Sequence, residues 1–155
     1  NYDWFKDLGY LNFLRDVGKH MPMSQMLQRE FVQTRLGSEG SGISYAEFSY
    51  SLIQGYDFLH LYREYDATLQ IGGSDQWGNM ISGAQMIKKL EGVDTHVLTV
   101  PLVLDKKTGK KFGKSEGNAV WLDSEMMSPY KFYQFWLNVD DKDLQKLFRY
   151  FSWVA

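Results

Sequence analysis

The fold is decided by the run Leu69-Gln70-Ile71-Gly72-Gly73-Ser74-Asp75-Gln76-Trp77-Gly78-Asn79. Residues 67–71 are short, apolar and β-leaning, and two glycines follow at once, so we expect a buried strand that ends in a tight turn. Ser74 or Asp75 is then expected to cap a helix that extends to about Glu91. A second strand is predicted over residues 95–104. This strand–helix–strand order predicts an α/β fold with parallel strands.

Helices are predicted on both sides of this unit. Ser44 opens the strongest of them, because Glu47 follows three residues later in the pattern of a capping box, and this helix is expected to reach about Glu64. An amphipathic helix is predicted over residues 21–34, with Ser24 as its N-cap. Further helices are predicted over residues 11–17, 125–137 and 142–151, and polar glycine-rich loops over residues 37–42 and 106–118.

Composition limits the classes of protein that this chain can belong to. Its 155 residues are 44% hydrophobic and 16% aromatic, which is ample for a packed core. The 17 Lys and Arg against 19 Asp and Glu give a net charge of −2, so any RNA partner would need a local basic patch. The absence of cysteine excludes disulfides, thiolate zinc sites and cysteine nucleophiles, and the three histidines have no metal-ligand spacing. No apolar run approaches the ~20 residues of a membrane span and no signal peptide is present, so we expect a cytosolic enzyme domain.

Three polar side chains share one stripe of the helix that begins after Ser44. At 100° per residue, Tyr50, Gln54 and Asp57 project at about 0°, 40° and −20°. A phenol, a carboxamide and a carboxylate on one stripe can bind an ammonium group and a hydroxyl together. The alternative is a solvent-exposed polar face opposite the core face.

The turn at residues 72–76 lies where a strand hands over to a helix. Ligands of open parallel sheets bind at the carboxyl ends of strands, and paired glycines let a ligand approach the backbone. Asp75 can accept from ribose hydroxyls, and Gln76 can bond the polar backbone of an amino acid. The alternative is an ordinary turn in which Ser74 or Asp75 only caps the helix.

A third cluster is Lys110-Lys111-Phe112-Gly113-Lys114-Ser115, inside the loop over residues 106–118. Ammonium groups on a glycine-rich loop are suited to stabilise the charge that develops on leaving pyrophosphate. The alternative is a solubilising charged loop. The spacing is not that of a P-loop.

Together and in this order, the three clusters resemble bacterial-type and organellar tyrosyl-tRNA synthetases, which belong to class I. The resemblance covers nearly the whole chain, from Tyr2-Asp3-Trp4 to Ser128-Pro129-Tyr130-Lys131-Phe132-Tyr133-Gln134-Phe135-Trp136. The run around Gly72-Gly73 is the most specific part. Lys-Phe-Gly-Lys-Ser is a variant of the Lys-Met-Ser-Lys-Ser loop that class I synthetases share.

The resemblance implies a domain layout. The chain is expected to be the second half of a Rossmann-like nucleotide-binding domain, with parallel strands, flanking helices and a helical N-terminal segment. Residues 1–43 would form a connecting and dimer-interface segment, residues 44–123 the core with the lysine loop, and residues 124–155 helices that lead toward an anticodon-binding domain. No His-Ile-Gly-His-type motif occurs, and the family carries that motif in the first half of the domain. Because the chain also begins at Asn1, we expect a processed chain or a fragment that is inactive on its own.

Site roles are implied residue by residue. Asp57 matches the carboxylate that accepts from the tyrosine hydroxyl, and rejection of a substrate lacking that hydroxyl by ~10⁴–10⁵ is the value for which tyrosyl-tRNA synthetases are themselves the standard example. The other matches are Tyr50 and Gln54 near the substrate ammonium, Gln76 near its carboxyl side, Asp75 with the backbone of Gly73 at the ribose, and Lys111, Lys114 and Ser115 at the ATP phosphates.

The implied reaction is activation of tyrosine by ATP to tyrosyl-adenylate, followed by transfer to the tyrosine tRNA. ATP enters as a substrate with Mg²⁺, no bound organic cofactor is expected, and no dedicated metal ligands can be identified. A homodimer is expected, with Tyr45 as an interface candidate and core packing as its alternative. No membrane contact is expected, and the location would be the cytoplasm or an organelle. Two other functions stay open: a non-catalytic synthetase-like RNA-binding or scaffold module, and a tryptophan-specific relative.

Overall fold

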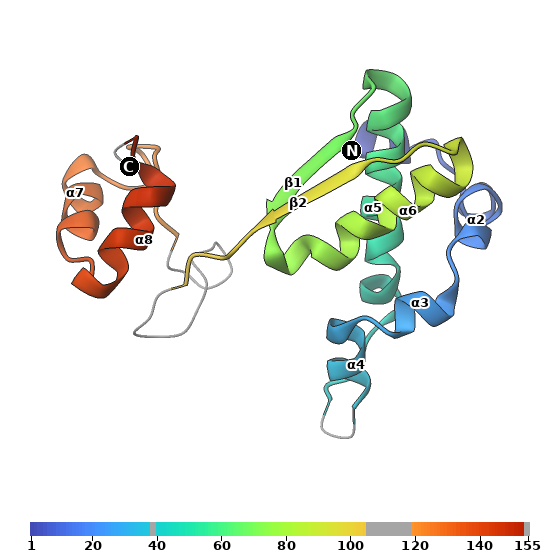
Figure 1. The fold of residues 1–155 in the computed structure, drawn as a ribbon, viewed down its shortest axis with the longest axis horizontal. Helices are drawn as coiled ribbons and strands as arrows, with labels where there is room; N and C mark the ends of the chain where they lie inside the picture. Colours follow the sequence, from blue (N-terminus) through green and yellow to red (C-terminus); the bar gives the residue numbers. More distant parts are fainter. Residues whose placement is uncertain (38–39, 105–118, 154–155) are drawn as a thin grey trace. The chain divides into compact units, whose positions relative to one another are not determined.

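The computed structural model describes residues 1–37, 40–104 and 119–153, and the chain divides into two compact units, Asn1–Pro101 and Leu102–Ala155. Within these described ranges no helix is long and apolar enough to cross a membrane. The first unit contains α1 (Tyr2–Phe5), α2 (Tyr10–Asp16), the 3₁₀ helix η1 (Gly18–His20), α3 (Met23–Leu27), α4 (Glu30–Leu36), α5 (Tyr45–Tyr65), β1 (Leu69–Gly73), the 3₁₀ helix η2 (Ser74–Gln76), α6 (Trp77–Glu91) and β2 (His96–Val100) (Figure 1).

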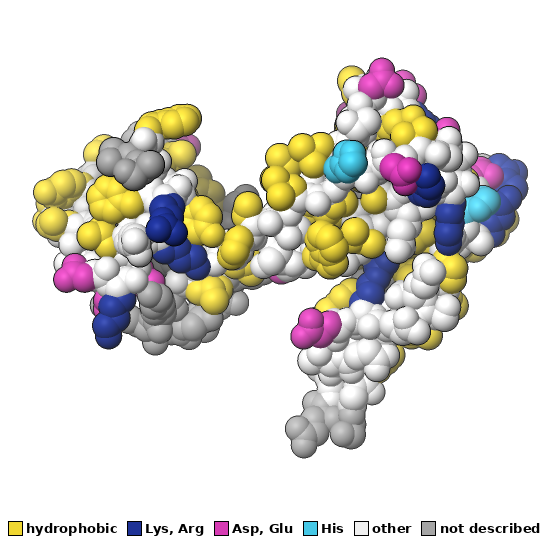
Figure 2. All heavy atoms as spheres, in the orientation of Figure 1, with side chains coloured by type: hydrophobic (Ala, Val, Ile, Leu, Met, Phe, Trp, Pro, Cys, Tyr) yellow, Lys and Arg dark blue, Asp and Glu magenta, His cyan; other side chains and the backbone are white. Residues whose placement is uncertain are grey.

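The two strands pair in parallel, which confirms the predicted α/β arrangement. Leu69 lies opposite His96 and Gly73 opposite Val100, with α6 as the crossover between the strands. The prediction of a buried strand is wrong, because β1 alternates between exposed and half-buried residues. One face of the pair carries Leu69, Ile71, Leu98 and Val100, and each of these side chains is at least 44% exposed (Figure 2).

The handover from β1 to α6 differs from the expected tight turn. Gly72 and Gly73 belong to β1, and the 3₁₀ turn η2 follows them. Neither Ser74 nor Asp75 caps α6, whose N-cap position is Gln76 without a side-chain capping bond. The turn itself supplies an acceptor, because the Trp77 N–H donates to the Ser74 carbonyl.

The single helix predicted over residues 21–34 is wrong, because the structure has two short helices, α3 and α4. Arg29, between them, has an extended backbone (φ −67°, ψ 137°) that redirects the chain. Pro22 rather than Ser24 occupies the N-cap position of α3. The break lets each helix bury one side chain, Met26 at 2% and Val32 at 1% exposure.

Helix α5 begins with the predicted capping box. The Ser44 hydroxyl accepts from the Glu47 N–H at 3.2 Å, and the Glu47 carboxylate accepts from the Ser44 N–H at 3.0 Å. The Ser44 N–H and the Ser44 hydroxyl, which both donate to the Glu47 carboxylate, and the Arg35 guanidinium beside it lower the pKa of Glu47 below its ordinary value. The helix ends at Tyr65, where Asp66 takes a left-handed conformation (φ 55°). The start and the end of α5 therefore lie close to the predicted positions.

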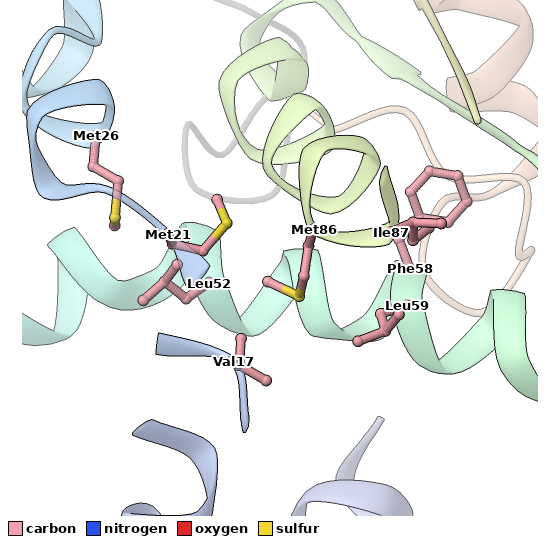
Figure 3. Close-up of a cluster of buried hydrophobic side chains, with 8 residues drawn as sticks. All are labelled: Val17, Met21, Met26, Leu52, Phe58, Leu59, Met86 and Ile87. Carbon is pink, nitrogen blue, oxygen red and sulfur yellow. The ribbon is translucent and has the colours of Figure 1, made fainter. Parts of the chain in front are cut away.

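The core of this unit is built on α5. Figure 3 shows eight buried side chains gathered around this helix: Val17, Met21, Met26, Leu52, Phe58, Leu59, Met86 and Ile87. Helix α6 approaches α5 closely because two glycines face each other. A Cβ built on Gly83 would lie 2.9 Å from the Phe58 Cβ and 3.3 Å from the carbonyl oxygen of Gly55. The two backbones therefore meet almost without intervening side chains.

Replacement of Gly83 by alanine should destabilise this unit by about 1–3 kcal/mol, because the new methyl group overlaps Phe58. Gly78 is the matched control on the same helix, since its Cβ would meet only the Arg29 Cδ at 3.7 Å. We expect Gly78→Ala to change stability by no more than about 0.5 kcal/mol. Urea unfolding of the two variants in the full-length protein measures both effects. Equal stability of the two variants would contradict the close contact.

The second unit contains α7 (Pro129–Leu137) and α8 (Asp141–Phe151). The helix predicted from residue 125 begins later, because Ser128 accepts from the Lys131 N–H at 3.3 Å and Pro129 occupies the first turn. Helix α8 confirms its prediction within one residue at its start and is capped by Asp140. Trp136 contacts the rings of Phe132 and Phe151, which joins the two helices.

Candidate functional site

The three stripe residues lie on α5 as predicted. Tyr50 is 57% exposed, whereas Gln54 and Asp57 are half-buried. Asp57 is seven positions after Tyr50, which places the two residues about 10 Å apart along the helix axis. The stripe is therefore long enough to contact both ends of an amino acid.

Asp57 is held by two donors from the start of the chain. The Trp4 Nε1–H donates to Oδ1 at 2.9 Å, and the Asn1 Nδ2–H donates to Oδ2 at 3.0 Å. An ionised carboxylate has about four acceptor positions, so each oxygen keeps capacity for a further donor. The two bonds fix the orientation of the carboxylate and leave it able to accept from a ligand hydroxyl.

Sequence reasoning missed Asn1 and Trp4 as site residues. They lie 56 and 53 residues from Asp57, and no spacing rule links them to α5. The one available signal was the position of Tyr2-Asp3-Trp4 inside the family resemblance. Trp4 has a further contact, since its ring stacks on His60 with the centroids 4.3 Å apart and the planes at 17°.

Tyr50 and Asp75 come together at one cavity of about 300 Å³. Its other lining residues are Phe31, Arg35, Ile43, Glu47, Gly78 and Asn79. Arg35 and Glu47 form an ion pair at 2.9 Å on its wall. The phenol from α5 and the carboxylate from η2 thus face a shared space, as expected for groups that contact one ligand.

The other predicted residues of the turn, Gly73 and Gln76, are close to Asp75 in the sequence but do not line this cavity. Gln76 is half-buried, and its Oε1 accepts from the Asn79 Nδ2–H at 3.5 Å. Gly73 ends β1 in an extended conformation (φ −71°, ψ 157°). Gly72 has a packing reason of its own, because a Cβ there would lie 2.9 Å from the Met80 Sδ. A side chain at position 72 would therefore require Met80 to move.

The predicted loop residues Lys111, Lys114 and Ser115 lie outside the described residues. Their roles stay predictions. The described part of the site therefore consists of the α5 stripe, the donors to Asp57 and the turn around Asp75.

The chain is similar to proteins of a known family. The family model described as class I tRNA synthetases (W and Y) matches residues 1–155. The chain is 51% identical over 155 residues to the tyrosine–tRNA ligase of Lactococcus lactis subsp. cremoris (strain MG1363), which covers all of this chain and 36% of that protein. It is 54% identical over 154 residues to the tyrosine–tRNA ligase of Bifidobacterium longum (strain DJO10A), which covers 99% of this chain and 34% of that protein.

The fold has a solved counterpart in the C-terminally truncated mitochondrial tyrosyl-tRNA synthetase of Coccidioides posadasii. The TM-score is 0.78 at 30% identity, and the match covers all of this chain and 44% of that one. The α/β fold with a parallel strand pair is thus that of a class I synthetase Rossmann-like domain. The chain spans about a third of the length of the curated relatives that it matches. Because the family model extends over all of its residues, the chain belongs to the class I tRNA synthetases of the tryptophan and tyrosine type.

Proposed function

We propose that the protein to which this chain belongs is a tyrosine–tRNA ligase, and that this chain supplies the part that recognises the tyrosine side chain. One observation carries the proposal. Asp57 shares a stripe of α5 with Tyr50 and Gln54, and two donors from the start of the chain orient its carboxylate. The curated relatives at 51% and 54% identity bear that name.

Asp57 would select tyrosine by accepting a hydrogen bond from the phenol hydroxyl. A carboxylate held by Trp4 and Asn1 cannot turn to find another partner when phenylalanine binds. The missing bond then leaves an acceptor poorly satisfied, which costs more than a lost methylene contact. Tyr50 and Gln54 would contact the substrate ammonium, toward the other end of the stripe.

Activation would proceed without a covalent bond to the protein. The tyrosine carboxylate attacks the α-phosphorus of ATP, pyrophosphate leaves, and a hydroxyl at the 3′ end of tRNA later attacks the adenylate carbonyl to release AMP. The protein contributes position and charge, with Asp75 and the Gly73 backbone at the ribose and Gln76 at the carboxyl side. ATP brings Mg²⁺ on its phosphates, and we assign Lys111, Lys114 and Ser115 to those phosphates from the sequence.

The partners follow from the same proposal. They are tyrosine, ATP, the tyrosine tRNA and a second copy of the protein. Tyr45 is 63% exposed and its hydroxyl lies 2.9 Å from that of Tyr10, so its core-packing alternative is wrong and its place at a homodimer interface stays a proposal. The proposed location is the cytoplasm, with an organelle as the alternative.

Pyrophosphate exchange by the full-length protein tests the proposal. We expect exchange with tyrosine and ATP, and less than about 10⁻³ of that kcat/KM with phenylalanine or tryptophan. Exchange with tryptophan instead would assign the protein to the other branch of the family. No exchange with any amino acid, combined with intact binding of tRNA, would identify a non-catalytic RNA-binding module.

A further inference from the structure

His60 lies on α5 one helical turn beyond Asp57, and both side chains contact the same indole. The Trp4 Nε1–H donates to Asp57 at 2.9 Å, while the Trp4 ring lies parallel to the His60 ring at 4.3 Å between centroids. Residues three apart on a helix share a face. One indole can therefore touch the carboxylate with its edge and the imidazole with its flat side.

The Trp4 ring is positioned by its contacts with α5. Tyr2–Phe5 bury no side chain completely. The indole donates to Asp57 and stacks on His60, so two residues of α5 determine where it lies.

The hydrogen bond to Asp57 does not determine the plane of the indole. The ring can rotate about the N–H···O direction and still keep the bond. The parallel imidazole of His60 removes this freedom, because a tilted indole would lose its stacking contact. The neighbouring contact of α1, between the Phe5 and Tyr56 rings at 5.3 Å, involves neither Asp57 nor the indole.

We propose that His60 is a positioning residue for tyrosine selectivity: its imidazole holds the Trp4 indole in the plane from which the indole N–H orients the Asp57 carboxylate. The inference rests on the proposed function, since Asp57 must be the acceptor of the substrate hydroxyl. His60 would act through Trp4 and not by contact with the substrate. Its effect reaches the amino-acid side of the site and leaves the ATP side unchanged.

Kinetics of the full-length protein with His60→Leu and His60→Phe test the proposal. Leucine removes the flat ring, so KM for tyrosine should rise about threefold to tenfold and the preference for tyrosine over phenylalanine should fall by the same factor. KM for ATP and kcat should stay within about twofold. Phenylalanine keeps a flat ring and should restore both values to within about twofold of the unmodified protein. His96→Leu, which replaces a histidine of β2, is the matched control. Its KM for tyrosine and its preference for tyrosine should equal those of the unmodified protein.

Three results would overturn the proposal: an unchanged KM for tyrosine in His60→Leu, equal rises of KM for tyrosine and for ATP, or no rescue by phenylalanine. A second measurement uses Trp4→Phe, which lacks the indole N–H. In that background His60→Leu should cause no further loss of tyrosine preference, because the route through the indole is already cut. A full additional loss would mean that His60 acts by another route, and the proposal would be wrong.

Asp57→Ala, assayed in parallel, separates this inference from the function on which it rests. An unchanged tyrosine preference in Asp57→Ala would overturn the assignment of Asp57, and the role of His60 with it. A collapsed preference in Asp57→Ala beside an unchanged one in His60→Leu would overturn the role of His60 alone.

Discussion

Replacement of Asp57 by alanine is expected to lower the preference for tyrosine over phenylalanine by about 10-fold to 10²-fold. Hydrogen bonds to charged groups contribute about 1.5–3 kcal/mol each, and every 1.36 kcal/mol is a factor of ten in rate. The variant loses the acceptor for the substrate hydroxyl and also leaves the Trp4 and Asn1 donors without their partner. Phenylalanine loses nothing comparable, because it never donates to Asp57. The ratio of kcat/KM for the two amino acids in pyrophosphate exchange measures the effect.

Asp75→Ala is the matched control, because it removes a second carboxylate from the same unit. At the proposed ribose contact it should lower kcat/KM for tyrosine and for phenylalanine by the same factor. The ratio between the two amino acids would then stay unchanged. A ratio that falls in Asp75→Ala and stays constant in Asp57→Ala would reverse the two assignments.

Replacement of Lys114 by alanine is expected to slow adenylate formation by about 10²–10³-fold, the usual loss when one preorganised group that stabilises transition-state charge is removed. The ammonium group would neutralise charge as pyrophosphate departs, so its contribution is largest in the transition state. In the proposed reaction tyrosine would bind before that charge develops and would not touch the leaving phosphates. The dissociation constant of tyrosine should therefore stay within about twofold, which equilibrium dialysis measures beside a single-turnover assay of adenylate formation.

Lys88→Ala is the charge-matched control for Lys114. The Lys88 ammonium forms an ion pair with Asp94 at 2.6 Å, and the side chain is half exposed. Its loss changes the net charge by the same unit and should leave adenylate formation unaltered. If Lys114→Ala weakened tyrosine binding as strongly as it slowed activation, the loop would act on the amino acid and not on the phosphates.

Local patterns predicted the parts of the fold that short-range chemistry determines. The capping box at Ser44 and Glu47 involves residues three apart, and the strand–helix–strand order restricts the two strands to a parallel pair. The break at Arg29 could not be predicted in this way. It depends on where Met26 is buried, and Met26 belongs to the core cluster with Leu52 of α5 and Met86 of α6, which are far from it in the sequence.

The candidate site also has a part that local patterns predict and a part that depends on contacts between distant residues. Tyr50, Gln54 and Asp57 could be assigned to one stripe because helical periodicity is local. The donors to Asp57 could not, since contacts across more than 50 residues have no period or spacing. The burial of β1 was overestimated for a related reason. Its apolar residues suggested cover on both faces, whereas the described structure leaves Leu69 and Ile71 exposed on one of them.

The glycine contact between α5 and α6 has a consequence for the substrates that fit. Asp57 is on α5, and Asp75 is in η2, the turn that leads into α6. The backbones of α5 and α6 touch at Gly55 and Gly83. The distance between Asp57 and Asp75 should therefore be nearly fixed, because main-chain atoms in contact cannot move apart or together as a flexible side chain can. Under the proposed function, free tyrosine would contact Asp57 alone, whereas the adenylate would contact both Asp57 and Asp75. A larger residue at Gly83, which would push α6 away from α5, should therefore weaken binding of the adenylate more than binding of free tyrosine.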